Sequence, residues 1–154
     1  MDLMEYRAQT LFDKYGLRCN LGTVVSDLEE LEEKKDQLVY PAVIKAQVRT
    51  GGRGKAGGIK FAENYGEAAA AAKAILGMDI KGHTVRKLMI SGKKEITREF
   101  YLSVMLDRGT KCPVFIFSPE GGMDIEKLAK EQPDVLCLCL LYTSDAADEL
   151  DGVD

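Results

Sequence analysis

Residues 42–62 read AVIKAQVRTGGRGKAGGIKFA, and this stretch decides the fold of the chain. The β-branched run at 42–48 and the short run at 58–62 predict two strands joined by a hairpin connection. Residues 49–58 contain five glycines and three cations, so their backbone can approach a ligand closely and present N–H groups to phosphate oxygens. We predict a strand–loop–strand hairpin tipped by a mobile phosphate-binding lid. The alternative is a solvated, flexible loop that merely contains basic residues.

Lys45 stands in the middle of the first predicted strand. Burying an unpaired ammonium group is costly, so such a lysine either extends to the sheet edge or faces an anionic ligand. Between Lys45 and Lys60 there are five cations and no acid, although the whole chain has a net charge of −4. This local excess of positive charge beside the glycine loop favours the anionic ligand.

The composition of the chain excludes several functional classes. A length of 154 residues, 45% hydrophobic and 30% charged, is typical of one soluble domain. The acidic balance argues against a dedicated nucleic-acid-binding protein, and no apolar stretch approaches the roughly 18 residues of a membrane span. The four cysteines have neither zinc-site nor disulfide-framework spacing. We therefore expect a cytoplasmic protein with reduced cysteines, no metal ligands, and no nucleic-acid or membrane partner.

The remaining pattern alternates helices and strands. Helices are predicted over 2–15, 27–38, 64–76 and about 124–130, and further strands over 21–25, 84–90, 99–108 and 113–117. Gly16 is placed for a helix C-cap, Ser26 and Glu29 for a capping box, and Asn64 for a reciprocal cap with Glu67. Residues 91–94 are expected to form a turn. This order predicts an α+β (α/β) fold with a mixed or antiparallel sheet packed with helices.

Two further positions, Glu99 and His83, have side chains that can serve in a binding or catalytic site. Glu99 begins a predicted strand, where its carboxylate could accept hydrogen bonds from a ribose or adenine; an ion pair with Arg98 or Lys94 is the alternative. His83 is the only histidine, and no Cys, Asp or Ser constellation surrounds it. We assign His83 no catalytic role.

Three motifs carry a resemblance to a known family: Met1–Tyr6 with Leu11-Phe12, Val43–Val48 running into Gly51–Gly58, and Glu120–Lys127. With them, residues 1 to about 136 resemble the N-terminal part of the β subunits of succinate–CoA ligases (ADP-forming), which are ATP-grasp enzymes. The β subunits of malate–CoA and citrate–CoA ligases share much of the pattern, so the organic acid stays open. The resemblance implies the N-terminal region of an ATP-grasp fold.

The resemblance also implies nucleotide-binding positions at Lys45, Gly52, Arg53, Gly54 and Glu99. Where the family usually has a glutamate before the hinge, this sequence has Ser91, and Lys94 stands at another nucleotide-contact position. A serine can hydrogen-bond but cannot accept as a carboxylate does. The preference for ATP or GTP is therefore left open.

By the same resemblance, the full-length protein reversibly couples succinate, CoA and ATP to succinyl-CoA, ADP and phosphate. The phosphoryl group passes through a histidine on a separate α subunit, in an αβ heterodimer or heterotetramer. The implied cofactors are ATP or ADP and Mg²⁺, with the metal ligands and the CoA and succinate sites beyond this chain. We expect no catalytic residue here and no activity from the fragment alone. A free-standing nucleotide- or anion-binding module and a plain structural fragment are the alternatives.

The C-terminal residues depart abruptly from the family pattern. Residues 139–149 resemble an in-frame translation of a sequencing adapter. We therefore expect residues 1–138 to form a partial ATP-grasp nucleotide-binding domain and residues 139–154 to be non-native or disordered.

Overall fold

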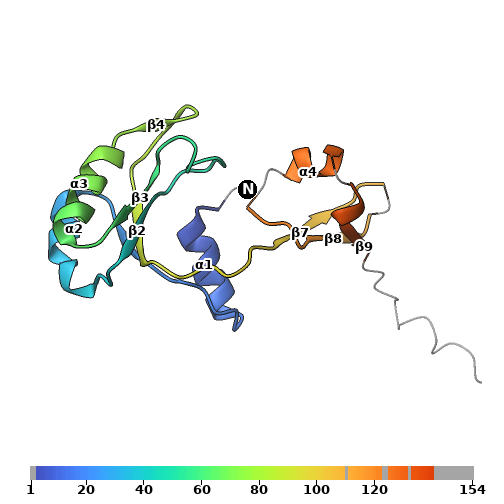
Figure 1. Ribbon diagram of the computed structural model, residues 1–154, viewed down its shortest axis with the longest axis horizontal. Coiled ribbons are helices and arrows are strands. Elements are labelled where there is room, and N and C mark those ends of the chain that lie inside the picture. Colours follow the sequence, from blue (N-terminus) through green and yellow to red (C-terminus); the bar gives the residue numbers. More distant parts are fainter. Residues whose placement is uncertain (1–2, 110, 123–124, 132, 141–154) are drawn as a thin grey trace, which may run out of the picture. The chain divides into compact units, whose positions relative to one another are not determined.

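The computed structural model describes residues 3–109, 111–122, 125–131 and 133–140. The chain forms two compact units, Met1–Lys94 and Glu95–Asp154 (Figure 1). The first unit has a four-stranded sheet and a separate two-stranded one, the second unit has a three-stranded sheet, and all three are antiparallel.

The sheet of the first unit has four strands, in the order β1 (Thr23–Val25), β6 (Leu88–Gly92), β2 (Ala42–Ala46) and β3 (Ile59–Ala62). Strands β2 and β3 pair antiparallel, with Ala42 opposite Ala62 and Lys45 opposite Ile59. The predicted strand–loop–strand hairpin is therefore confirmed.

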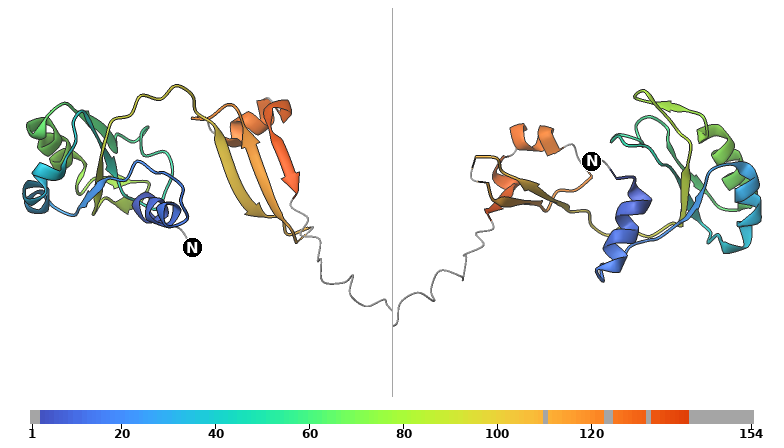
Figure 2. Two further views of the ribbon diagram at one scale, coloured as in Figure 1. Left: turned by 90° about the horizontal axis from the view of Figure 1, so that it is seen from below. Right: turned by 180° about the vertical axis from the view of Figure 1, so that it is seen from behind.

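Helices lie on both sides of this sheet. The α2 helix (Leu28–Glu33) and the α3 helix (Tyr65–Ile75) pack on one face, while α1 (Glu5–Lys14) lies on the other side (Figures 1 and 2). Side chains alternate along a strand, and in β2 alternate residues are fully buried between the sheet and α2 and α3. The intervening positions, Val43 and Lys45, are half-buried and by the same alternation face the opposite side, which is the side of α1.

The start of α3 follows the predicted cap. The Asn64 side chain accepts a hydrogen bond from the Glu67 amide (3.0 Å), and the Glu67 carboxylate accepts one from the Glu63 amide (2.8 Å). The helix ends at Ile75, and Gly77 follows with a φ of 80°. Gly16 likewise has a φ of 79° directly after α1, as a C-cap position requires.

The second helix is shorter than expected. It ends at Glu33 and is followed by a 3₁₀-helix at Lys35–Gln37, so the prediction of one helix over 27–38 was wrong in its length. The capping residue is Asp27, one position later than Ser26: its side chain accepts from the Glu30 amide at 2.7 Å. The Glu30 carboxylate in turn accepts from the Ser26 amide at 2.7 Å. Serine and aspartate are both favoured at the N-cap position, and in α2 the Asp27 carboxylate occupies it.

The segment after α3 contains a small hairpin instead of one continuous strand. Strands β4 (Asp79–Ile80) and β5 (His83–Thr84) pair with each other, and β6 begins only at Leu88. The expected turn at 91–94 was also wrong at its start, because Ser91 and Gly92 continue β6. Ser91 lies opposite Val43 and Gly92 opposite Ala42, so pairing with the central strand outweighs the turn-forming preference of the Ser-Gly pair.

The second unit contains β7 (Tyr101–Leu106), β8 (Pro113–Ser118) and β9 (Cys137–Leu140), in that order. The predicted β7–β8 pair is confirmed, with Leu102 opposite Phe117. Helix α4 (Ile125–Glu131) and a 3₁₀-helix (Pro133–Val135) lie between β8 and β9. Of the tail expected at 139–154, residues 139–140 belong to β9, and the rest lie outside the described residues.

None of the helices in the described part of the chain has the length and apolar character needed to cross a membrane. Cys19, Cys112 and Cys137 carry free thiols.

We expect Asn64→Ala to lower the free energy of unfolding by about 1 kcal/mol, because it removes the side-chain acceptor that caps α3. Urea unfolding would measure this. Asn64→Ser keeps an uncharged acceptor at the cap and should lose less stability than the alanine variant. Equal stability of the alanine and serine variants would contradict the capping role.

We also expect Gly58→Ala to destabilise the hairpin by about 1 to 3 kcal/mol. A Cβ at Gly58 would lie 2.6 Å from Ile80 Cδ1 and 3.1 Å from Ala46 Cβ. Gly51→Ala is the matched control, because its Cβ would meet nothing within 4 Å. Adding Ile80→Val to Gly58→Ala removes the contacted methyl group and should restore part of the lost stability. Urea unfolding that ranks the two glycine variants equally would refute this steric argument.

Candidate functional site

Lys45 lies on the α1 side of the sheet, on a strand whose other face is in the core. Its Nζ atom is 3.1 Å from Oε1 of Glu5, the first residue of α1. Its side chain is 25% exposed. The lysine therefore neither extends into solvent nor stands unpaired, because an acid 40 residues earlier in the chain reaches it.

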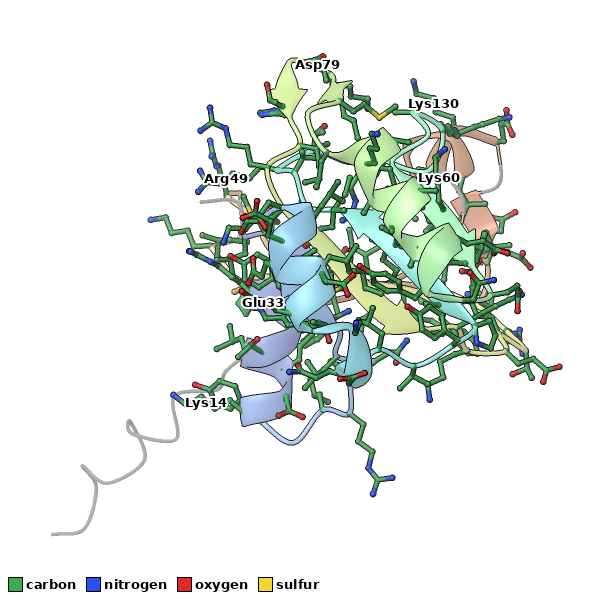
Figure 3. All side chains as sticks on the ribbon, turned by 90° about the vertical axis from the view of Figure 1, so that its left-hand side faces the viewer. Lys14, Glu33, Arg49, Lys60, Asp79 and Lys130 are labelled. Carbon is green, nitrogen blue, oxygen red and sulfur yellow. The ribbon has the colours of Figure 1, made fainter. Side chains whose placement is uncertain are left out.

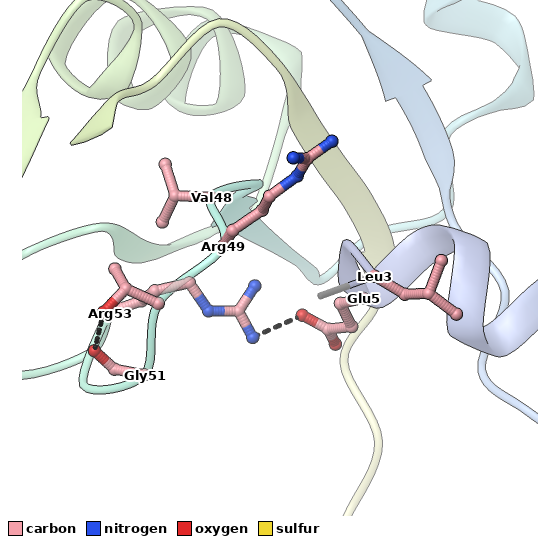
Figure 4. Close-up of a pocket in the computed structure, with 7 residues that line it drawn as sticks. Leu3, Glu5, Val48, Arg49, Gly51 and Arg53 are labelled. Atoms are coloured by element: carbon pink, nitrogen blue, oxygen red, sulfur yellow. Dashed lines mark hydrogen bonds and ion pairs between the residues drawn. The ribbon is translucent and has the colours of Figure 1, made fainter. Parts of the chain in front are cut away.

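Arg53 contacts the same carboxylate from the glycine loop (Figure 4). Its Nη2 atom is 2.7 Å from Glu5 Oε2, and its Nη1 atom donates to the Ala46 carbonyl at 2.9 Å. Glu5 thus bridges the two cations, giving one oxygen to each. The structure brings together the strand lysine and the lid arginine that the sequence singled out separately.

Gln47 fixes the start of α1 against the end of β2. It is 1% exposed, and its Oε1 atom accepts from the Tyr6 amide at 3.2 Å. Its Nε2 group donates to the carbonyls of Lys45 and Ala46 at 3.3 and 3.4 Å. This buried amide holds the first turn of α1 over the strand, which places Glu5 beside Lys45.

The backbone of the lid folds back on itself after residue 54. The amides of Ala56, Gly57 and Gly58 donate to carbonyls within the loop, at 3.2, 3.1 and 2.8 Å. In contrast, the amides of residues 52–54 donate to no other backbone carbonyl in the described part of the chain. Such unpaired amides beside cations are suited to binding phosphate oxygens.

A further cation lies beside this part of the loop. A Cβ built on Gly52 would lie 3.2 Å from Lys81 Nζ, so the ammonium group contributed by the β4–β5 turn approaches the lid. Gly52 itself has a φ of 78°, a conformation that favours glycine.

Two open surface cavities lie beside the loop, and both include Val48 and Arg49 in their lining. One, of about 450 Å³, lies between the start of α1 and the loop (Figure 4) and is lined by Leu3, Glu5, Val48, Arg49, Thr50, Gly51 and Arg53. The other, of about 460 Å³, is lined by Met4, Gln47, Val48, Arg49, Gly82, His83, Thr84, Arg86 and Lys87. Its lining includes three cations and no acid. Both cavities are large enough for a small organic ligand.

The electrostatics of the site depend on Glu5. Burial by itself raises the pKa of this carboxyl, but the charges of Arg53 and Lys45 and their hydrogen bonds lower it further than burial raises it. The net pKa of Glu5 is therefore below its ordinary value, and the group is ionised near neutral pH. The ionised Glu5 carboxylate therefore stabilises the folded protein at pH values above the ordinary pKa of a glutamate. This stabilisation is lost as the pH falls through the lowered pKa of Glu5.

Ser91 shares the sheet face of Lys45. It lies opposite Val43, one of the half-buried residues on that face, and is 3% exposed. Its Oγ atom is buried without a hydrogen-bond partner in the described part of the chain. A buried hydroxyl without a partner is uncommon in folded proteins, and the role of Ser91 in binding nucleotide stays a prediction.

The other two predicted positions are Lys94 and Glu99. Lys94 is exposed and is the last residue of the first unit. Glu99 belongs to the second unit, where its carbonyl accepts from the Gly121 amide at 3.1 Å and its side chain lies against Gly122. Their roles in binding nucleotide stay predictions.

Sequence reasoning missed Glu5 and Lys81. Glu5 looks like an ordinary acid in the first turn of a helix, which the helix dipole alone would explain. Lys81 lies in a two-residue turn with no local signal of function. Only long-range packing shows that both side chains reach the lid.

Metal ligands are not grouped in the part of the chain that the structure describes. Among those residues, no set of three or more His, Cys, Asp and Glu side chains could hold a metal ion.

The chain is similar to several known proteins. The chain is 50% identical over 133 residues to the succinate–CoA ligase [ADP-forming] subunit beta of Rubrobacter xylanophilus, covering 86% of this chain and 35% of that protein. It is 48% identical over 136 residues to the same-named subunit of Herpetosiphon aurantiacus, covering 88% and 36%. The chain thus spans about a third of the length of these curated relatives.

Solved structures share the fold. A dinucleotide-forming acetyl-coenzyme A synthetase of Ca. Korarchaeum cryptofilum matches with a TM-score of 0.72 at 16% identity, covering 90% of this chain and 60% of that one. An ATP citrate lyase from Methanothrix soehngenii matches with a TM-score of 0.69 at 21% identity, covering 97% and 37%. The family model of the ATP-grasp domain matches residues 2–150. The chain therefore belongs to the ATP-grasp family.

Proposed function

We propose that this chain is the nucleotide-binding portion of the β subunit of a succinate–CoA ligase (ADP-forming). In the whole enzyme it would take part in the reversible conversion of succinate, CoA and ATP to succinyl-CoA, ADP and phosphate. The identity of about half of the aligned residues to two β subunits of that name supports the proposal.

One observation carries the proposal: Lys45 Nζ and Arg53 Nη2 converge on a single two-oxygen anion, the Glu5 carboxylate. Two cations that meet one carboxylate are spaced to meet two oxygens of a phosphate. The amides of Gly52, Arg53 and Gly54 lie in the same loop without backbone acceptors. A phosphate chain on this surface would therefore meet both fixed charges and backbone donors.

The role of these groups in phosphoryl transfer would be positioning and charge stabilisation. Phosphoryl transfer develops negative charge on the phosphate oxygens, which cations and N–H groups held in place stabilise. We assign Lys45 and Arg53 to the phosphates of ATP or ADP and the 52–54 backbone to the lid over them. Ser91, Lys94 and Glu99 would contact the nucleoside end.

Other components would come from outside the described residues. Magnesium normally neutralises part of the phosphate charge in such sites, and it prefers carboxylate and carbonyl oxygens. The described part of the chain gathers no ligand set for it. We therefore place the Mg²⁺ ligands, the sites for CoA and succinate, and the phosphorylated histidine of an α subunit in other parts of the αβ complex.

A related function with another organic acid is the second candidate. The sequence motifs also resemble those of the β subunits of malate–CoA and citrate–CoA ligases, which is the reason to consider malate or citrate in place of succinate. These alternatives share the proposed nucleotide site, so substrate tests with each acid separate them. A free-standing nucleotide-binding module is the third candidate, and it would bind ATP–Mg at micromolar strength through the isolated 1–138 segment.

We expect Arg53→Ala and Lys45→Ala to lower succinate- and CoA-dependent ATP use by the full-length αβ complex on the order of 100-fold. Each substitution removes one cation from the proposed phosphate site. Steady-state kinetics would measure the effect. Lys60→Ala is the matched control, because it removes a cation from the exposed part of β3 (Figure 3) and should leave the kinetics unchanged. Unchanged kinetics for Arg53→Ala would show that the lid arginine takes no part in nucleotide use.

We further expect the 154-residue chain alone to show no succinate- and CoA-dependent nucleotide hydrolysis, because the proposed metal, CoA and phosphohistidine sites lie elsewhere. A coupled assay for ADP release, with and without added α subunit, would test this. Turnover by the purified chain would contradict the proposal that it supplies only the nucleotide-binding portion.

A further inference from the structure

We propose that Glu5 is an internal anion that occupies Lys45 and Arg53 in the nucleotide-free protein and that nucleotide phosphate must displace it. The inference rests on the proposed function, since it concerns the same two cations. It adds a residue of the N-terminal helix to the control of the nucleotide site.

Contact geometry supports direct competition. Each Glu5 oxygen contacts one cation, at 3.1 Å from Lys45 Nζ and 2.7 Å from Arg53 Nη2. These are the atoms that a phosphate would need. The exposed fractions of the three side chains are only 22% for Glu5, 25% for Lys45 and 21% for Arg53. A phosphate that bridges the same two nitrogen atoms therefore competes with the carboxylate for the position between them.

The charges of the groups favour replacement of the Glu5 carboxylate by nucleotide phosphate. Glu5 supplies one negative charge to two cations, so the cluster keeps a net charge of +1. A nucleotide phosphate chain carries more negative charge than a carboxylate and offers more acceptor oxygens. If Glu5 stayed in place, two anions would share the pair of cations and repel each other. Displacement removes that repulsion.

The helix that carries Glu5 is suited to release it. No residue of α1 is fully buried, and Leu11 and Phe12 are 44% and 49% exposed. Besides the two ion pairs, one hydrogen bond from the Tyr6 amide to Gln47 holds its first turn to the strand. An element with few buried contacts can shift at low cost in free energy.

Displacement would also free Arg53 to follow the ligand. In the nucleotide-free arrangement, the arginine is fixed by Glu5 on one side and by the Ala46 carbonyl on the other. Without Glu5, the arginine keeps its hydrogen bond to the neutral Ala46 carbonyl. The lid could then move with Arg53 as phosphate binds, so that lid movement and release of α1 are one event.

The test compares Glu5→Gln with wild type in the 154-residue chain. ATP is titrated in the millimolar range, and ¹H–¹⁵N spectra follow the amides of Gly52, Arg53 and Gly54. Glutamine keeps the shape of the side chain and removes its charge, so we expect ATP to bind about fivefold more tightly. In wild type, ATP should also move the ¹³C shift of the Glu5 carboxyl.

Glu33→Gln is the matched control. It removes the same charge from an exposed position of α2 that makes no ion pair in the described part of the chain (Figure 3). Its ATP affinity should equal that of wild type. Lys45→Ala should abolish the ATP-induced shifts in both the wild-type and Glu5→Gln backgrounds.

Each outcome decides the inference. Tighter binding by Glu5→Gln alone, or binding by Glu5→Gln where wild type shows none, supports displacement. Equal or weaker binding by Glu5→Gln overturns it and makes Glu5 a structural counter-ion. Absence of ATP-induced shifts in both proteins overturns it as well. The proposed function is judged separately, by the kinetics of Lys45→Ala and Arg53→Ala in the full-length complex.

Discussion

The alternation of side chains along β2 is the constraint on which the rest of the first unit depends. One set of residues packs against α2 and α3, and the intervening set faces α1. A one-residue change of register would exchange the two faces and bury Lys45 in the apolar core. Antiparallel pairing with β3 and β6 on both sides prevents this. The same pairing that builds the core therefore fixes where the cation points.

The positive charge around the glycine loop comes from neighbouring elements as well as from residues of the loop. Lys45 comes from the strand before it, Arg53 from the loop and Lys81 from a separate hairpin. Lys45 and Arg53 both contact one carboxylate, and two cations that close repel each other unless an anion is present. Glu5 supplies that anion in the protein itself. Both the nucleotide proposal and the displacement proposal follow from this balance of charge.

Local chemistry predicted the elements that depend on neighbouring residues. The β2–β3 hairpin and the Asn64–Glu67 cap were identified from short patterns, and both are confirmed. The predicted turn at Ser91 was wrong, because pairing with Val43 is a contact between residues distant in the chain. The single helix over 27–38 was wrong because a regular charge pattern does not show where an α-helix tightens into a 3₁₀ turn.

The sequence by itself determined that a cationic glycine loop follows a strand with a lysine in its middle, because both features are local. It also determined the ATP-grasp membership, through motifs that the family model matches over residues 2–150. Only the tertiary structure decided what Lys45 and Arg53 contact. Their common partner, Glu5, lies 40 residues from Lys45, and a helix packed on the opposite side of the sheet from the core brings it there. No local propensity encodes a contact of that length.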